Sequence, residues 1–186
     1  KVYGEGEWKV RQHGKSKRRT WRKLHLAIDA ATQEIVAVAL TEAGRADCQE
    51  LPGLLLQIEG AISRVGTDGA YDTWECRYAI IQKEAQAVIP PRENAVVNGN
   101  AKIEEVRQRD EAIRQIEERG LEGWKVQRGY HRRSLVETAM FRVKRTFGGA
   151  LRARAIQNQI AEALLKSRIL NRFIHQGMPK TVKSPA

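Results

Sequence analysis

The 186-residue sequence is poor in the features that mark secreted or membrane-embedded chains. Its two cysteines, Cys48 and Cys76, argue against a disulfide-stapled secreted scaffold and suit a reducing compartment. The longest uninterrupted apolar stretch runs from Ile35 to Leu40, far short of the roughly 20 residues that cross a bilayer. The composition therefore argues against a disulfide-rich mini-protein and against a membrane-spanning helix.

Several common site motifs are also missing. The cysteines, His25 and His131 do not form the paired spacing of a zinc site. The glycines around Gly69 lack the glycine and lysine spacing of a phosphate-binding loop or a dinucleotide fingerprint. There are no internal repeats and no low-complexity tracts. The sequence therefore gives no indication of a zinc site, a phosphate-binding loop or a dinucleotide-binding site.

Charge is both abundant and segregated. The chain holds 33 Lys or Arg and 22 Asp or Glu, for a net charge of +11, and 41% of its residues are hydrophobic, enough for a folded core. The net charge is distributed over four segments: +7 in 1–25, −7 in 26–121, +7 in 122–154 and +4 in 155–186. Two basic regions thus flank an acidic middle.

Basic segments that come together in a fold favour a polyanionic partner, and nucleic acid is the usual one. A solvated basic surface with no partner is the plainer alternative. An anionic membrane surface fits less well, because the basic stretches lack the long apolar face of an interfacial helix.

Hydrophobic periodicity predicts a mixed α/β domain. Alternating residues and turn signals predict strands at 24–28, 34–40, 62–67 and 87–89, and helical spacing predicts helices within 47–59 and over 72–84, 103–118, 131–147 and 155–175. Sheets linked in this way place polar residues at the carboxyl ends of strands, where their sites lie.

Two carboxylates stand out by position. Asp68 ends an apolar strand and precedes Gly69, so that a ligand or another backbone can approach it closely. Glu137 lies in the most basic predicted helix. At 100° per residue, Arg133, Glu137 and Lys144 fall within about 60° of Tyr130.

A buried stripe of apolar residues is expected beside that polar group: Val136, Met140, Val143 and Phe147. We therefore expect Glu137 to be half-buried between Arg133 and Lys144 and to stay ionised. Together with Asp68 it can hold Mg²⁺, and two such ions can activate a hydroxyl group and stabilise the leaving oxygen of a phosphodiester. The alternative is an ordinary i,i+4 ion pair between Arg133 and Glu137.

The spacing of these residues resembles a known signature. Tyr130, Arg133, Glu137 and Lys144 reproduce the Tyr-Arg-Glu-Lys pattern of bacterial insertion-sequence DDE transposases, and Thr67-Asp68-Gly69-Ala70-Tyr71-Asp72 resembles their second acidic motif. The opening Lys1–Gly14 and the run Ile89-Pro90-Pro91-Arg92 are similar too. The resemblance covers about residues 1–178.

The resemblance implies an RNase H-like fold, a mixed sheet flanked by helices, as one catalytic domain over 1–178 with a tail at 179–186. It implies metal-dependent cleavage and strand transfer at the ends of the mobile element, with Mg²⁺ or Mn²⁺ held by Asp68 and Glu137. Tyr130, Arg133 and Lys144, with His131 and Arg132 beside them, would bind DNA phosphates. The implied setting is the bacterial cytoplasm, near the nucleoid, with a homodimer on transposon-end and target DNA.

In this family the first catalytic Asp lies just ahead of a segment like Lys1–Gly14, so we expect the chain to lack it, together with the N-terminal region that binds the DNA ends. Asp29 is a possible substitute, but a hairpin turn is the preferred role there. Asp47 and Asp72 are interpreted as helix caps, and Asp72 lies near enough to Asp68 in sequence to support it.

Two rival functions stay open. One is a non-catalytic transposase remnant that binds DNA electrostatically. The other is a ribonuclease or repair nuclease on the same fold, which explains the phosphate-directed residues less well.

Overall fold

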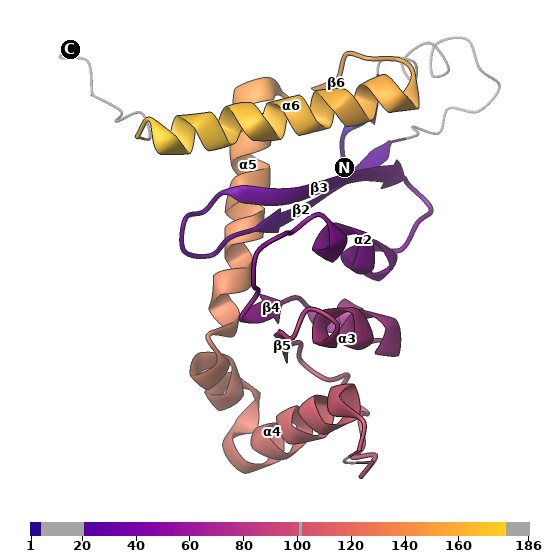
Figure 1. Ribbon diagram of the computed structural model, residues 1–186, viewed down its shortest axis with the longest axis vertical. Coiled ribbons are helices and arrows are strands. Elements are labelled where there is room, and N and C mark those ends of the chain that lie inside the picture. Colours follow the sequence, from indigo (N-terminus) through magenta and orange to yellow (C-terminus); the bar gives the residue numbers. More distant parts are fainter. Residues whose placement is uncertain (5–20, 101, 178–186) are drawn as a thin grey trace. The chain divides into compact units, whose positions relative to one another are not determined.

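The protein has a mixed α/β architecture in a computed structural model that describes residues 1–4, 21–100 and 102–177. Two compact units make up the chain, one from Lys1–Ala43 and Thr138–Ala186 and the other from Gly44–Glu137. The boundary between the two units in the sequence, Glu137 to Thr138, falls within helix α5, Leu135–Phe147, which Figure 1 labels. Most of the similar opening stretch, residues 5–14, lies outside the described residues.

The first unit is built on the predicted hairpin. Strands β2, Arg22–Ile28, and β3, Ile35–Glu42, pair antiparallel, as their alternating pattern predicts. Asp29 begins the turn, and its carboxylate accepts hydrogen bonds from the backbone N–H groups of Ala31 at 2.6 Å and Thr32 at 3.3 Å. The preferred turn role of Asp29 is therefore confirmed.

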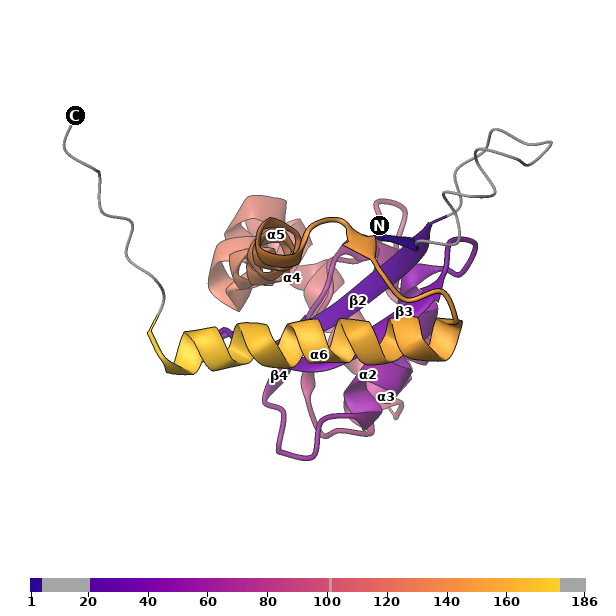
Figure 2. The same cartoon turned by 90° about the horizontal axis from the view of Figure 1, so that it is seen from above.

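Helix α6, Ile156–His175, lies across this hairpin and packs on β3 (Figure 2). The side chain of Asn171 accepts a hydrogen bond from the N–H of Ile35 at 2.8 Å and donates one to its carbonyl at 2.9 Å. A short parallel pair, β1 Tyr3–Gly4 with β6 Ala150–Leu151, accounts for the other strands that the structure describes in this unit. Its small core contains Val2, Leu40 and Leu151.

The second unit contains a parallel strand pair joined by a helix. Strand β4, Arg64–Gly66, pairs with β5, Gln86–Val88, and helix α3, Trp74–Ile81, connects them. A 3-10 helix η1, Asp47–Glu50, continues into α2, Leu51–Leu56, with Pro52 tolerated in the first turn. The core formed by these elements contains Leu51, Leu55, Cys76, Ile80, Ala85 and Ile89.

Helix α4, Glu104–Arg128, is interrupted at Gly120, where φ is 72° and ψ is 163°. The sequence predicts a helix that ends at residue 118, whereas the chain only kinks at Gly120 and continues as a helix to Arg128. Gly129, at φ 63°, ends α4 in the left-handed region. A second core cluster joins this end of α4 to the strands: Val88, Ala112, Trp124 and Tyr130.

Three local predictions need correction. Thr73 caps α3, its hydroxyl accepting from the N–H of Cys76 at 3.2 Å, so the cap assigned to Asp72 was wrong. Ala46, rather than Asp47, occupies the N-cap position of η1. The helix expected over 131–147 begins as a 3-10 turn, η3 Tyr130–Ser134, because the left-handed Gly129 separates it from α4.

The helices in the described part of the chain offer no segment that combines the length and apolarity needed to span a bilayer.

Candidate active site

Asp68 stands where the sequence predicts it, directly after a strand. Strand β4 ends at Gly66, and Asp68 caps the following 3-10 helix, η2 Gly69–Tyr71. Its Oδ1 accepts a hydrogen bond from the N–H of Ala70 at 2.9 Å. The residue is exposed, and its second oxygen makes no hydrogen bond within the described residues. One carboxylate oxygen is therefore oriented by the backbone while the other stays open to a ligand.

The segments that follow the two parallel strands lie against each other. A Cβ added to Gly69 would sit 3.5 Å from the carbonyl oxygen of Pro90, at ordinary van der Waals distance. The acidic motif after β4 and the Ile89-Pro90-Pro91-Arg92 run after β5 therefore meet at the carboxyl edge of the strand pair. This edge is where α/β sheets commonly place their sites.

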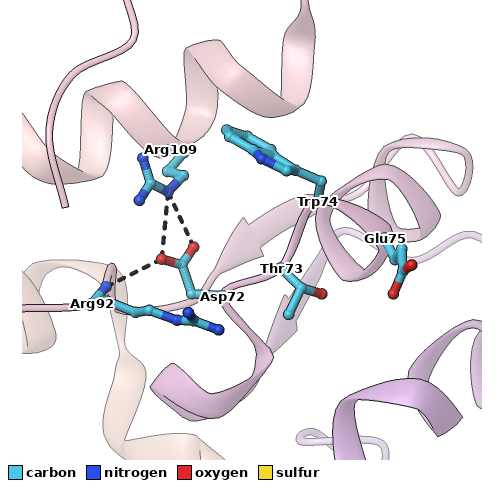
Figure 3. A pocket seen from close by; sticks show the side chains of 6 residues that line it. All are labelled: Asp72, Thr73, Trp74, Glu75, Arg92 and Arg109. Atoms are coloured by element: carbon cyan, nitrogen blue, oxygen red, sulfur yellow. Dashed lines mark hydrogen bonds and ion pairs between the residues drawn. The ribbon is translucent and has the colours of Figure 1, made fainter.

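Asp72 ties four segments together. Its side chain is 1% exposed and accepts a hydrogen bond from Nε of Arg77 at 2.8 Å. It also accepts from Nε of Arg109 at 3.3 Å and from the backbone N–H of Arg92 at 3.1 Å. Figure 3 shows the carboxylate between Arg92 and Arg109. The residue that capping rules assigned to α3 is thus the buried centre of an ion-pair network.

Arg77 completes this network on the buried side. Its Nη2 donates to the carbonyl of Ile89 at 3.2 Å, and its Nη1 is buried without a partner among the described residues. Burial lowers the pKa of Arg77, and the adjacent Asp72 carboxylate opposes that shift. Burial also raises the pKa of Tyr71, and the charges of Asp47 and Asp68 add to the rise. The tyrosine therefore stays a neutral hydrogen-bonding group beside Asp68.

A pocket of about 440 Å³ opens beside the network. The residues that line it come from the start of α3, from the segment after β5 and from α4: Asp72, Thr73, Trp74, Glu75, Arg92 and Arg109 (Figure 3). Trp74 and Arg109 were not candidates from sequence, and Arg92 stood out only as the end of the run Ile89-Pro90-Pro91-Arg92. No local signal could have found them together, because they are brought to one place only by the fold.

The basic segment is anchored by Tyr130. Tyr130 is 9% exposed, and its ring lies 5.9 Å, centroid to centroid, from the buried indole of Trp124. The guanidinium carbon of Arg133 sits 5.3 Å from the Tyr130 ring centroid. Cation–π contact of this kind orients the arginine on the ring face.

Glu137 is more exposed than the helical wheel predicts. Its side chain is 69% exposed, and Oε1 accepts from Nη1 of Arg133 at 3.3 Å. The expectation of a half-buried carboxylate is wrong, because the buried residues of α5 are Ala139 and Val143, and at 100° per residue Glu137 lies on the opposite side of the helix. The ordinary i,i+4 ion pair is present. Lys144, His131 and Arg132 are exposed as well.

The elements that carry the two acidic candidates are neighbours within the second unit. Strand β4, which leads to Asp68, packs against η3, which leads to Glu137. Arg64 on β4 donates from Nη1 to the carbonyl of Arg128 at 3.4 Å, just before η3. Over the described residues, no group of three or more His, Cys, Asp or Glu is placed to hold a metal ion.

Comparison with known families decides the class of the protein. Residues 1–172 match the family model described as a Transposase DDE domain. The chain belongs to this family. The match spans both units and confirms the resemblance to insertion-sequence DDE transposases that the acidic motifs indicated. DDE transposases act on DNA and generally use divalent metal ions. No solved structure matches the chain.

Proposed function

We propose that this transposase belongs to the Tyr-Arg-Glu-Lys group and uses an RNase H-like fold to cleave and join DNA at insertion-sequence ends. The observation that carries the proposal is the packing of β4 on η3, which brings the segment of Asp68 beside the segment that leads to Glu137. The family match over 1–172 supports the reaction class. The parallel β4–α3–β5 unit supports the fold, because it gives Asp68 a strand-end position.

The donor chemistry fits Mg²⁺, since Asp68 and Glu137 are both exposed carboxylates with hard oxygen atoms. Two carboxylates leave most of the coordination positions of such an ion to water and to the DNA. When bound, the ion supplies Lewis-acid stabilisation of a phosphodiester and a more acidic water or hydroxyl group.

The chain's own residues position the DNA in this proposal. The side chain of Arg133 is held on the face of Tyr130 and is 36% exposed, so it can bind a phosphate while it keeps Glu137 oriented. Lys144 lies seven residues beyond Glu137 on α5, two helical turns along the same side. His131 and Arg132 add exposed basic groups beside them. Asp72 holds the Asp68 segment in place without touching DNA.

The test is metal-dependent nicking by the gene product that contains this chain, acting on the ends of its own insertion sequence. We expect Asp68→Asn and Glu137→Gln to abolish Mg²⁺-dependent nicking while DNA binding is retained, because each removes one metal ligand. Glu59→Gln is the matched control, since Glu59 is an exposed acid of the second unit outside the site. Equal nicking by wild type and Glu137→Gln would remove Glu137 from the reaction.

A second candidate is DNA binding without catalysis by this chain alone. The absence of a three-acid group in the described residues favours it, as does the net charge of +11. Binding should weaken steeply with salt, and Arg133→Gln or Lys144→Gln should each lower the slope of log K against log salt by about 0.9. Arg119→Gln, an exposed arginine on α4, serves as the control. Binding that does not change with salt would contradict this reading.

A further inference from the structure

The pocket at the start of α3 combines an aromatic surface with a cation, Arg92, that forms no ion pair with an acid among the described residues. Trp74 is 48% exposed, unusual for a large indole, and lines the hollow. Arg92 also lines it, and its guanidinium makes no ion pair or hydrogen bond with the described residues. Its backbone N–H is instead fixed on Asp72, and two prolines precede it, so its position is held from the main chain.

The Trp74 ring is oriented before any ligand arrives. The guanidinium carbon of Arg109 lies 5.4 Å from its ring centroid, and Arg109 is itself fixed by Asp72 and by the carbonyl of Val96 at 3.3 Å. One face of the indole is thus occupied by a residue committed to the network. The exposure of the ring leaves its remaining surface available for stacking.

The electrostatics of the hollow favour an anion at Arg92. The charge of Asp72 is offset by Arg77 and Arg109, which leaves Arg92 and Glu75 as the charged groups without a fixed partner. In Figure 3, Glu75 lies beyond Thr73 as seen from Arg92. A phosphate beside Arg92 would therefore be separated from the Glu75 carboxylate, and the Thr73 hydroxyl proton could be donated to it.

We propose that this pocket binds one unpaired nucleotide of DNA, with its base stacked on Trp74 and its phosphate on Arg92. The inference rests on the proposed DNA-directed function and adds a substrate feature to it, namely a single-stranded nucleotide. A volume of about 440 Å³ lies within the range of about 300–1,000 Å³ for ligand pockets. Stacking on an aromatic side chain needs no particular base, because every base offers a π face.

The test compares three DNA duplexes by fluorescence anisotropy with the protein as it is. One is blunt, one carries a three-thymidine overhang, and one carries an overhang of three abasic sugar phosphates with the same charge. We expect the thymidine overhang to bind about tenfold more tightly than the abasic one, which is the gain expected from stacking. Equal binding of the two overhangs would overturn the proposal.

Variants assign the preference to the pocket. Trp74→Ala should remove the tenfold preference and leave the blunt duplex unchanged, whereas Trp74→Phe should keep most of it. Tyr78→Ala is the matched control, because Tyr78 is 54% exposed on the same helix but does not line the pocket. Arg92→Gln should weaken binding of both overhangs and spare the blunt duplex. A loss of preference in Tyr78→Ala equal to that in Trp74→Ala would overturn the assignment.

Photocrosslinking tests the contact with Trp74 directly, so that a variant's effect on the fold is not mistaken for a lost contact with DNA. An overhang carrying 5-iododeoxyuridine should photocrosslink to Trp74, located by mass spectrometry, and a crosslink elsewhere with none at Trp74 would overturn the proposal. Free thymidine monophosphate should compete only at concentrations far above the overhang DNA; tighter binding of the free nucleotide would make the pocket a mononucleotide site instead.

Failure of the pocket can be told apart from failure of the proposed function. If the blunt duplex binds but no overhang preference is seen, only the nucleotide pocket is overturned. If none of the three duplexes binds, the DNA-directed function of the chain fails as well.

Discussion

The strand-end segment at 68–72 and the basic segment at 130–137 both present carboxylates, but the fold treats them differently. Asp72 is buried among two arginines and a backbone N–H, whereas Glu137 is exposed and paired only with Arg133. Asp68 resembles Glu137 in its exposure, although it lies four residues from Asp72. Acidic residues in one short motif can thus divide between holding the fold and facing a ligand.

The largest difference in stability between these two kinds of acidic residue is expected at Asp72. Asp72→Asn leaves the Arg77 guanidinium, 1% exposed, without its charge partner, and we expect a loss of about 3–5 kcal/mol in the free energy of unfolding. Urea denaturation followed by circular dichroism measures it. Asp68→Asn keeps a side chain that can cap η2 and should change stability by less than about 0.5 kcal/mol. Similar losses in both variants would erase the distinction between them.

The next largest effect is expected at the anchor of the basic segment. Tyr130→Ala empties a buried site against Trp124 and should cost about 3 kcal/mol, measured in the same denaturation assay. Tyr130→Phe keeps the ring and should lose less than about 1 kcal/mol. If Tyr130→Phe also abolished DNA binding, the hydroxyl group would have a role in the site separate from packing.

A substitution at the kink in α4 should lower the free energy of unfolding by a smaller amount. Gly120 has φ 72° and ψ 163°, a region open almost only to glycine, so Gly120→Ala should destabilise by about 1–3 kcal/mol. Gly53→Ala is the control in α2, where no atom lies within 4 Å of an added Cβ, and it should stabilise by about 0.4–1 kcal/mol. Thermal unfolding distinguishes the two. A neutral Gly120→Ala would mean that the kink can straighten.

The smallest effect on stability is expected at Glu137, the exposed acid of the basic segment. Because the Arg133–Glu137 pair is exposed, Glu137→Gln should change the free energy of unfolding by less than about 0.5 kcal/mol. Urea titration of this variant beside Asp72→Asn gives the contrast directly. A loss above about 2 kcal/mol would place Glu137 among the structural acids and weaken its proposed role as a metal ligand.

The sequence predicts what local patterns encode. Alternating residues predict the β2–β3 hairpin, and an apolar run ending in Asp68 predicts the strand end. Helical spacing predicts α6 to its last residue and to within one residue of its first. The helix predicted over 103–118 corresponds to the first part of α4, before the kink at Gly120. In each case the determining residues are close together in sequence.

The missed features depend on distant residues. Asp72 satisfies the local rule for a cap, but Arg109, 37 positions away on α4, makes it part of a buried network. The regular wheel fails at 130–134 because Gly129 adopts a left-handed conformation and Tyr130 is drawn into the core against Trp124. Hydrophobic periodicity predicts neither the long-range ion pair of Asp72 nor the left-handed conformation of Gly129.

The contact of Asn171 with Ile35 has a consequence for how the hairpin behaves among other chains. An amide side chain that satisfies both the N–H and the carbonyl of one strand residue occupies the place that an incoming strand would take. The outer border of the hairpin is therefore blocked at that residue against edge-to-edge association. Protection from aggregation is supplied here by one asparagine on a helix more than a hundred residues away in sequence.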